Sequence, residues 1–413
     1  MHARHRNLTD GVSRASQRGS QDAPTLPYHV PCLSLGAMPI TTEVLVVGLG
    51  AMGSCTLAAL ARRGIKAIGI DRFTPPHTEG SSHGASRIIR EAYYEDPIYV
   101  PLVRDAYAEW ARLAAESGRT LFHQTGGLCY GSPEGALVHG ALASARVHDV
   151  AHELLDAREI QRRFPAHRLP DGFVGVLETR AGWLDPEQCL TAALEVATRH
   201  GATVRTRETM LAWKPNANSV RVTTDGATYE AAHVIISAGM WMGDLVPSLA
   251  AHLTVQRNVL YWLAGVRPLF DAARFPVFLG ELAPDLLWYG FPDVGAGVKV
   301  AMHRHGRTCT PATVDRTVHE AELAAMRARL MQWLPTANGP LQRTVVCTYT
   351  NTRDGHFVID THPASDRCWI VSPCSGHGFK FASAIGARIA ARVSGDASAS
   401  LPGRFRLSRL ERS

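Results

Sequence analysis

The chain has 413 residues, of which 46% are hydrophobic and 19% charged, and it carries a formal net charge of +6 at pH 7. A chain of this size forms two or three globular domains or one large α/β body, and no apolar run approaches the roughly 18 residues that span a bilayer. Scattered arginines carry nearly all of the positive charge, which argues against a nucleic-acid-binding protein. An anionic small molecule fits this charge equally well.

The eight cysteines are scattered and include no C-x-x-C pair. This pattern argues against a disulfide-rich scaffold and against structural zinc, so we expect no metal site. A reducing compartment is the simplest interpretation of the free thiols, and we therefore expect a cytoplasmic location.

Residues 1–40 are rich in Arg, His, Ser, Gln and Pro and show neither helical nor strand periodicity. They also lack the apolar core of a secretory signal peptide. The composition predicts a disordered extension. Because Met38 directly precedes the first predicted strand, a misassigned start is an alternative explanation of this segment.

The first organised stretch predicts a strand, a glycine-rich turn and a helix. Residues 44–47 are apolar and typical of a short buried strand, and Gly48, Gly50 and Gly53 follow as G-x-G-x-x-G before a helix that extends to Arg63. The first glycine permits the tight turn, the second the approach of a pyrophosphate, and the third the packing of helix on strand. The phosphates would then bind the free N–H groups at the start of the helix.

A second apolar strand over residues 67–70 leads to Asp71, whose carboxylate is placed to accept hydrogen bonds from a ribose. With both strands and the acid present, the stretch predicts a nucleotide site. The alternative is a glycine-rich turn in an ordinary βαβ unit, and the motif does not separate FAD from NAD.

A polar loop over residues 81–86 precedes R-I-I-R, in which Arg87 and Arg90 are three positions apart. If the segment becomes helical at its end, this spacing places both guanidinium groups on one face. A solvated pair of surface arginines is the alternative interpretation.

The remaining elements alternate between strands and helices. Helices are predicted from Pro101, from an N-cap at Asp185 to Gly201, over residues 315–334, and over residues 381–393. Strands are predicted for residues 126–131, 172–178, 220–224, 228–236, 254–262 and 286–303. The nucleotide-binding body is therefore expected to combine the two ends and the middle of the chain, with other segments inserted between them.

Four motifs occur in order over residues 42–395. They are the glycine turn with Asp71, S-H-G-x-S-R-I-I-R at residues 82–90, Y-G-F-P at residues 289–292 with Lys299 and His303, and C-T-Y-T-N-T at residues 347–352 with S-G-H-G-F-K-F at residues 375–381. Together they resemble the family of monomeric sarcosine oxidases and N-methyltryptophan oxidases, with the peroxisomal sarcosine and pipecolate oxidases.

The resemblance implies an α/β protein in which an FAD-binding Rossmann-like domain is interleaved with an α+β substrate domain on a mixed, mostly antiparallel sheet. It implies an FAD-dependent oxidase of secondary amino acids that transfers a hydride from the C–N carbon to flavin N5, releases an imine and reduces O2 to H2O2. The expected domain ranges are 41–123, 181–253 and 336–396 for FAD, 124–180 and 254–335 for substrate, and 397–413 for a tail. A monomer is expected.

The resemblance also assigns individual residues. Arg90 and Lys380 would bind the substrate carboxylate, Lys299 would activate O2, and Tyr289 and His303 would line the substrate cavity. The residues assigned to FAD are Gly48, Gly50, Ala51, Met52, Gly53, Asp71, His83, Arg87, Met210, Cys347, Gly376, His377, Gly378 and Lys380. Cys347 would carry the flavin covalently through its 8α-methyl group.

The chemistry of these residue types agrees with the assignment. Arginine offers a forked donor to a carboxylate, lysine adds a second charge, and a fixed cation in a dry site stabilises charge that develops on O2. Without the resemblance, Lys299 would be interpreted as a solvated strand residue and Cys347 as a small buried hydrophobic residue.

The sequence departs from the family pattern at T-R-D-G after the tyrosine motif and at Pro373-Cys374 before S-G-H-G, and the spacing from Tyr289 to Lys299 is one residue shorter. Sarcosine, larger N-methyl amino acids and cyclic pipecolate or proline all remain open as substrates. The alternatives are a flavin dehydrogenase that passes electrons to a carrier, a non-enzymatic flavin-binding subunit and an NAD-dependent dehydrogenase.

Overall fold

The computed structural model describes residues 38–372 and 375–412. Of the predicted extension, residues 1–37 lie outside the described residues. The first strand begins at Ile40, earlier than the apolar core at residues 44–47, because its first residues already pair with a neighbouring strand, Ile40 opposite Tyr229.

The first sheet carries the glycine turn. Its strands follow the order β10-β11-β12-β1-β2-β9, and β20 pairs with β12 and with β19. Strand β1 is parallel to β2 and β12, whereas β10, β11 and β12 form an antiparallel meander. The strands are β1 (Ile40–Val47), β2 (Ala67–Asp71), β9 (Thr203–Thr206), β10 (Met210–Pro215), β11 (Val220–Thr224), β12 (Thr228–Ile236), β19 (Val358–His362) and β20 (Ser365–Ser372).

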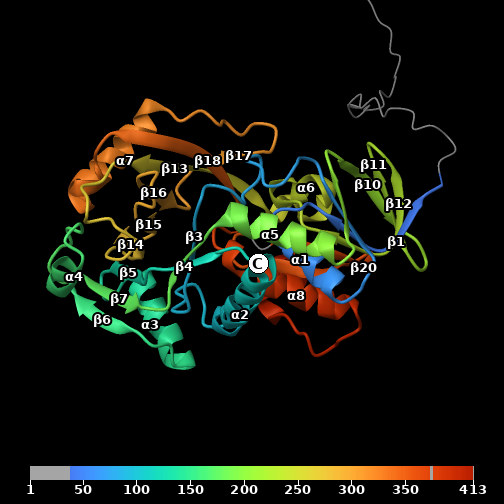
Figure 1. The fold of residues 1–413 in the computed structure, drawn as a ribbon, viewed down its shortest axis with the longest axis horizontal. Helices are drawn as coiled ribbons and strands as arrows, with labels where there is room; N and C mark the ends of the chain where they lie inside the picture. Colours follow the sequence, from blue (N-terminus) through green and yellow to red (C-terminus); the bar gives the residue numbers. More distant parts are fainter. Residues whose placement is uncertain (1–37, 373–374, 413) are drawn as a thin grey trace, which may run out of the picture. The chain divides into compact units, whose positions relative to one another are not determined.

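Four helices accompany this sheet, and α1 packs against both α5 and α8 (Figure 1). They are α1 (Ala51–Arg62), α2 (Tyr99–Ser117), α5 (Pro186–Arg199) and α8 (Ala382–Val393). Alanines and small apolar residues dominate the buried face of α1, which lets the three helices approach closely. The Asp185 carboxylate caps α5 by accepting a hydrogen bond from the N–H of Gln188 at 2.9 Å, as predicted.

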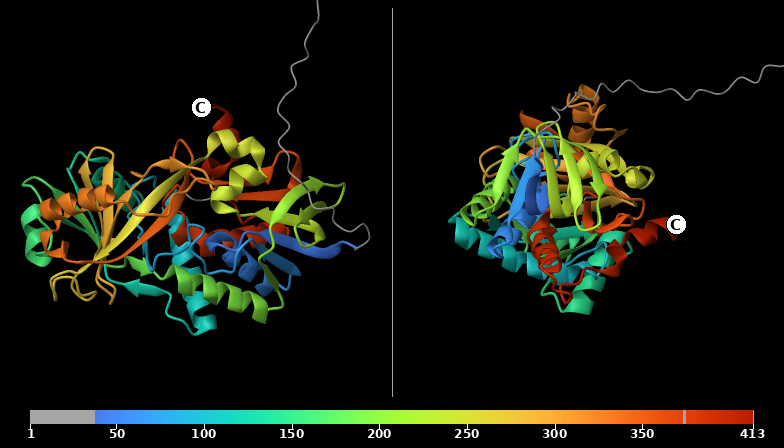
Figure 2. Two further views of the ribbon diagram at one scale, coloured as in Figure 1. Left: turned by 90° about the horizontal axis from the view of Figure 1, so that it is seen from above. Right: turned by 90° about the vertical axis from the view of Figure 1, so that its right-hand side faces the viewer.

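The second sheet follows the order β17-β13-β16-β15-β14-β5-β7-β6, with β18 paired to β13. Only the β14–β5 pair is parallel among its described pairings, so the predicted mixed, mostly antiparallel sheet is confirmed. Long strands β13 and β18 extend from this sheet toward the first one (Figure 2). The elements are β5 (Gly127–Gly131), β6 (Glu153–Asp156), β7 (Val174–Glu178), β13 (Thr254–Leu263), β14 (Val277–Ala283), β15 (Leu286–Phe291), β16 (Val298–His303), β17 (Thr308–Cys309), β18 (Leu341–Asn351), α3 (Ala136–His148), α4 (Ala157–Arg163) and α7 (Glu320–Trp333).

A small third sheet, β3-β8-β4, carries the first arginine of R-I-I-R. Its strands are β3 (Arg87–Ile89), β4 (Phe122–Gln124) and β8 (Gly182–Leu184). The remaining elements are α6 (Met242–Leu245) and the 3₁₀ turns η1 (Gly239–Trp241), η2 (Pro247–His252), η3 (Pro335–Ala337), η4 (Phe379–Phe381), η5 (Gly403–Phe405) and η6 (Leu407–Arg412). The domain ranges given above stay a prediction.

Three local expectations were wrong. The end of the 81–90 segment is the strand β3 rather than a helix, because it pairs with β8. Helix α2 begins two residues before Pro101, which its first turn tolerates. Helix α7 begins at Glu320 rather than near residue 315, because His319 and Glu322 form a capping box there.

Within residues 38–372 and 375–412, the structure contains no helix with the length and apolarity needed to cross a membrane.

The core of the second sheet contains a buried histidine, His167, which is 1% exposed. Its ring lies between 5.1 and 5.2 Å from the rings of Tyr130, Phe275 and Phe278, and neither ring nitrogen has a hydrogen-bond partner within the described part of the chain. Burial lowers the pKa of His167 to about 3, so the folded protein keeps this ring neutral.

His167 should therefore make stability depend on pH. The unfolded chain binds a proton on this ring near pH 6.5 and the folded chain does not. The stabilisation of the folded state by the neutral ring is therefore fully present above pH 6.5 and is lost as the pH falls toward 3. Between pH 7 and pH 5 the unfolding free energy decreases by about 2 kcal/mol for this reason. We expect urea titrations of His167→Phe to show a smaller loss of unfolding free energy over this interval, whereas His139→Gln, at an exposed position, behaves as wild type. Equal losses in all three proteins would contradict the assignment.

Candidate functional site

The glycine turn connects β1 to α1 and contacts the end of β12. Gly48 has φ +86°, and a Cβ on it would lie 2.7 Å from the carbonyl oxygen of Ser237. A Cβ on Gly53 would lie 1.8 Å from the carbonyl oxygen of Gly48. At Gly50 the nearest atom to an added Cβ is the Ser82 hydroxyl, at 3.3 Å. Packing thus demands glycine at the first and third positions, and the second fits the close approach of a ligand.

Asp71 ends β2 and is 6% exposed. One carboxylate oxygen accepts the N–H of Leu49 at 2.7 Å, and the other accepts the N–H of Phe73 at 2.7 Å. The side chain therefore holds the glycine turn against β2, a structural task that the ribose assignment did not include. The oxygen that accepts from Phe73 also lies 3.5 Å from His77 Nε2, whereas the other keeps a second lone pair, so the ribose contact stays a prediction that this geometry permits.

The loop before β3 is held from two sides. The Nζ of Lys299, on β16, lies 2.7 Å from the carbonyl oxygen of Gly84 and 2.9 Å from both the carbonyl and hydroxyl oxygens of Ser86. The Glu187 carboxylate, in the first turn of α5, accepts the N–H groups of Gly84 at 2.7 Å and Ala85 at 3.1 Å. A lysine from one sheet and a carboxylate from a helix of the other layer thus hold residues 84–86 between them, and both contact Gly84.

Lys299 is buried, with 2% of its surface exposed, and its Nζ lies 4.5 Å from the ring centroid of Phe291. Burial, aided by the charge of Arg87, holds the pKa of Lys299 well below its usual value. Both protonation states satisfy the site: the ammonium donates to all three oxygens, and the neutral amine donates to two and accepts from the Ser86 hydroxyl. A negative charge placed nearby would favour the ammonium.

Cys347 lies on β18 and is 2% exposed. The Nη2 of Arg87 is 3.6 Å from its Sγ and 2.9 Å from the carbonyl oxygen of Ser81. The guanidinium of Arg87 therefore contacts the Cys347 sulfur directly. The structure thus brings together two predicted residues from distant parts of the chain.

Two residues predicted to line the substrate cavity lie beside the S-G-H-G segment. The hydroxyl of Tyr289 is 3.4 Å from that of Tyr349, and the ring of His303 is 5.7 Å from the ring of Tyr349. Gly376 has φ +78°, and a Cβ there would lie 2.9 Å from His303 Cε1. Burial holds the pKa of His303 well below its usual value, so the ring is neutral.

Arg90 directly follows β3, and its side chain contacts different residues from those that Arg87 contacts. Its guanidinium donates to the carbonyl oxygen of Ala92 at 2.5 Å and to the Glu95 carboxylate at 3.0 Å. The expectation that the two arginines share one helical face is therefore wrong, because side chains three positions apart in an extended segment point to opposite sides, here toward Cys347 and toward Glu95.

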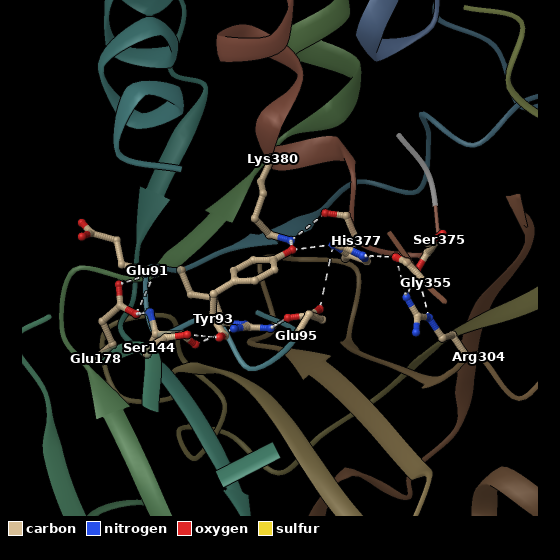
Figure 3. A network of polar contacts seen from close by, with 12 residues as sticks. Glu91, Tyr93, Glu95, Ser144, Glu178, Arg304, Gly355, Ser375, His377 and Lys380 are labelled. Atoms are coloured by element: carbon tan, nitrogen blue, oxygen red, sulfur yellow. Dashed lines mark hydrogen bonds and ion pairs between the residues drawn. The ribbon is translucent and has the colours of Figure 1, made fainter. Parts of the chain in front are cut away.

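Lys380 and His377 meet beneath α2 and α8 (Figure 3). The Nζ of Lys380 donates to the carbonyl oxygen of His377 at 2.9 Å and to the Tyr93 hydroxyl at 3.4 Å. Burial, and next the charge of Arg90, lower the pKa of Lys380 to about 7, while Glu95 opposes this shift. This lysine is therefore a cation whose charge depends on its neighbours near neutral pH.

The other predicted residues are placed as follows. Ala51 and Met52 begin α1, and Gly378 precedes η4. Met210 is buried at the start of β10, in the core of the first sheet, and its adenine contact stays a prediction. The departure at Pro373-Cys374 lies outside the described residues.

Sequence reasoning missed four residues at this site: Tyr93, Glu95, Glu187 and Tyr349. Tyr93, Glu187 and Tyr349 act through contacts between segments far apart in the chain, and Tyr349 is marked only as a member of C-T-Y-T-N-T. Glu95 pairs with Arg90, five positions earlier. The only signal for Tyr93 and Glu95 was their place in E-A-Y-Y-E, directly after R-I-I-R.

The residues present fit FAD. The glycine turn provides the cradle, and buried polar atoms without hydrogen-bond partners among the described residues include both ring nitrogens of His83, His303 Nε2, Thr350 Oγ1 and Ser372 Oγ. Buried polar groups normally have partners, so these atoms have hydrogen-bonding capacity left for a polar ligand. The described residues contain no cluster of three or more His, Cys, Asp or Glu side chains able to hold a metal ion.

Comparison with known proteins gives a consistent result. A family model described as FAD dependent oxidoreductase (DAO) matches residues 43–392. Monomeric sarcosine oxidase from Streptomyces avermitilis is 40% identical over 360 residues, covering 86% of this chain and 94% of the relative. N-methyl-L-tryptophan oxidase from Yersinia pestis is 32% identical over 346 residues, covering 83% and 92%.

A similar solved structure is that of NikD, described as an unusual amino acid oxidase essential for nikkomycin biosynthesis. It superposes with a TM-score of 0.77 at 26% identity and covers 89% of this chain and 97% of NikD. The likeness therefore extends over both large sheets.

Proposed function

We propose, from the premise that this chain belongs to the FAD dependent oxidoreductase family, that it oxidises a secondary amino acid at the C–N bond and passes the electrons to O2. The membership confirms the resemblance, the fold class and FAD as the cofactor predicted from the sequence. The substrate class is inferred from the relatives' activities and from the charges of the site.

One observation carries the substrate proposal: two buried cations share a single carboxylate. Arg90 is 5% exposed and Lys380 is 6% exposed, and Glu95 is the carboxylate that interacts with both. Excess positive charge in a buried site is unfavourable unless an anion joins it. A substrate carboxylate supplies that anion, and the arginine fork with the lysine charge would fix its orientation.

The reaction balances with these participants. The amine loses two electrons and two protons to become an imine, O2 gains them to become H2O2, and water then hydrolyses the imine. Bound FAD supplies the two-electron acceptor that connects these halves. The chain's own residues orient the carboxylate, exclude water and stabilise charge.

We assign the stabilisation of charge on O2 to Lys299. Its ammonium is fixed by three oxygens in a dry setting, so no reorganisation is needed when negative charge develops beside it. The neighbouring anion in turn raises the pKa of the lysine, which makes the ammonium the prevailing form during that step.

We also propose a covalent bond between the Cys347 sulfur and the flavin 8α-carbon. The buried thiol beside Arg87 supports this proposal. In the linkage the thiol and the 8α-methyl group each lose one hydrogen, an S–C bond forms, and the two electrons and two protons pass to O2. The names of the relatives further support a monomer.

The substrate proposal predicts which amines give peroxide. With sarcosine, N-methyl-L-tryptophan, L-proline and L-pipecolate, we expect at least one to yield H2O2 in a 1:1 ratio to consumed O2 in a peroxidase-coupled assay. Its amide, which lacks the anionic carboxylate, should be at least about tenfold poorer in kcat/KM. Flavin reduction without peroxide would indicate a dehydrogenase, and no flavin reduction by any of these amines would contradict the proposal.

The covalent link predicts that acid-precipitated wild-type protein stays yellow. In Cys347→Ser the serine hydroxyl cannot form the bond, so the flavin should appear in the supernatant, while the buried Cys368→Ser, a control on β20, keeps it in the pellet. The absorbance of pellet and supernatant measures the outcome. A colourless wild-type pellet would contradict the link.

A further inference from the structure

Tyr93 lies between the two cations of the proposed carboxylate site. Its ring centroid is 4.6 Å from the guanidinium carbon of Arg90 and 5.2 Å from the Nζ of Lys380. The ring is fully buried and has no exposed surface. The negative face of an aromatic ring attracts a cation, so the Tyr93 ring stabilises the two positive charges on either side of it.

The backbone of Tyr93 is fixed as well. The hydroxyl of Ser144, on α3, donates to the carbonyl oxygen of Tyr93, and the Glu178 carboxylate accepts the N–H groups of Glu91 and Ala92 at 2.8 to 2.9 Å. Figure 3 shows these contacts on the side of Tyr93 away from Lys380. The tyrosine is therefore anchored at both ends.

The directions of the hydrogen bonds follow from the acceptors. The Nε2 of His377 lies 2.9 Å from the carbonyl oxygen of Gly355, which can only accept, so Nε2 carries the proton. Burial holds the pKa of His377 well below its usual value, so Nδ1 is unprotonated. The Tyr93 hydroxyl, 2.6 Å from Nδ1, must then donate to it.

This leaves the lone pairs of the Tyr93 oxygen for a donor, and Lys380 Nζ is that donor, at 3.4 Å (Figure 3). The sequence of donors is thus Lys380 to Tyr93, Tyr93 to His377, and His377 to Gly355. Because the Tyr93 hydroxyl donates its hydrogen bond to His377, its oxygen can only accept from Lys380. An acceptor at this position favours the charged form of the amine.

We propose that Tyr93 is a positioning residue for the carboxylate site. Its hydroxyl donates to His377 and accepts from Lys380, which favours the charged form of the lysine. Its ring holds Lys380 at the distance from Arg90 that a substrate carboxylate requires. The inference rests on the proposed function and deepens it, since it names what sets the affinity of that site for an anion.

Several titratable groups act on Lys380, on Tyr93 or on their neighbours Tyr94 and His377, and share in the pH dependence. They are Arg90, Tyr94 and Glu95 from the segment after β3, Tyr99 from α2, Cys129 from β5, Arg304 after β16 and His377 after β20. Tyr93 and Tyr99 have pKa values raised by burial, and that of His377 is lowered. Among these groups Lys380, with a pKa of about 7, is the one that changes charge near neutral pH.

The test is the binding of acetate, a minimal carboxylate, to the purified holoenzyme by calorimetry between pH 6 and 9. Acetate should bind most tightly below pH 7 and more weakly as the ammonium loses its proton. In Tyr93→Phe the acceptor is lost, so we expect the pH of half-maximal affinity to fall by about 0.5 to 1 unit. At pH 7.5 the affinity should fall about three- to tenfold, with more protons taken up per acetate bound.

Tyr94→Phe is the matched control, since Tyr94 also faces Arg90, at 5.2 Å, whereas Lys380 contacts Tyr93 and Phe381. It should leave the pH profile unchanged, and flavin content reports whether each variant folds. If Tyr93→Phe does not fold, His377→Phe should produce the same shift and His377→Gln, which restores an acceptor, should reverse it.

If acetate affinity depends on pH in the same way in Tyr93→Phe and Tyr94→Phe, the role of Tyr93 is contradicted, while the proposed carboxylate site stands. Absence of acetate binding to wild type at every pH would instead overturn the carboxylate site of the proposed function, and the inference with it.

Discussion

The contact between Lys299 and the loop before β3 is the constraint on which the site depends. Lys299 belongs to the second sheet, while the oxygens of Gly84 and Ser86 belong to a loop that reaches the glycine turn through Ser82. This one side chain therefore connects the layer that carries the dinucleotide motif to the layer that carries the predicted substrate residues. Glu187 holds the other side of the loop and supplies countercharge. Burial lowers the pKa of this lysine, and its ammonium becomes the favoured form when a negative charge lies beside it.

The same principle recurs at the second group of cations. Arg90 and Lys380 are buried, Glu95 pairs with Arg90, and the Tyr93 ring faces both cations while its hydroxyl accepts from Lys380. Both groups contain a lysine whose pKa is lowered by burial and whose charged form an added anion would favour. Sites of this kind are organised in advance for an anion, either one that binds or one that forms during a reaction. In the proposed function, the substrate carboxylate is the anion that binds and the charge on O2 is the anion that forms.

Much of the fold was predictable because its signals are local. The glycine turn, the cap at Asp185 and the apolar strands depend on neighbours in the sequence, and they form where the sequence predicts them. The strand β3 was not predictable, since its conformation is decided by pairing with β8, nearly a hundred residues later. The pairing of Arg87 with Cys347 and of Tyr93 with His377 likewise joins segments that are remote in the chain. Family resemblance identified some of these residues, whereas the contacts among them required coordinates.

The most direct test of the central claim separates the two halves of the reaction in Lys299→Met. Rapid mixing measures the anaerobic reduction of the flavin by substrate and the reaction of the reduced enzyme with O2, with Lys214→Met, at an exposed position, as the control. If the buried ammonium stabilises charge on O2, the oxygen reaction should slow by about 100-fold or more while reduction changes by less than about tenfold. Equal slowing of both steps, or an unchanged oxygen reaction, would contradict the account.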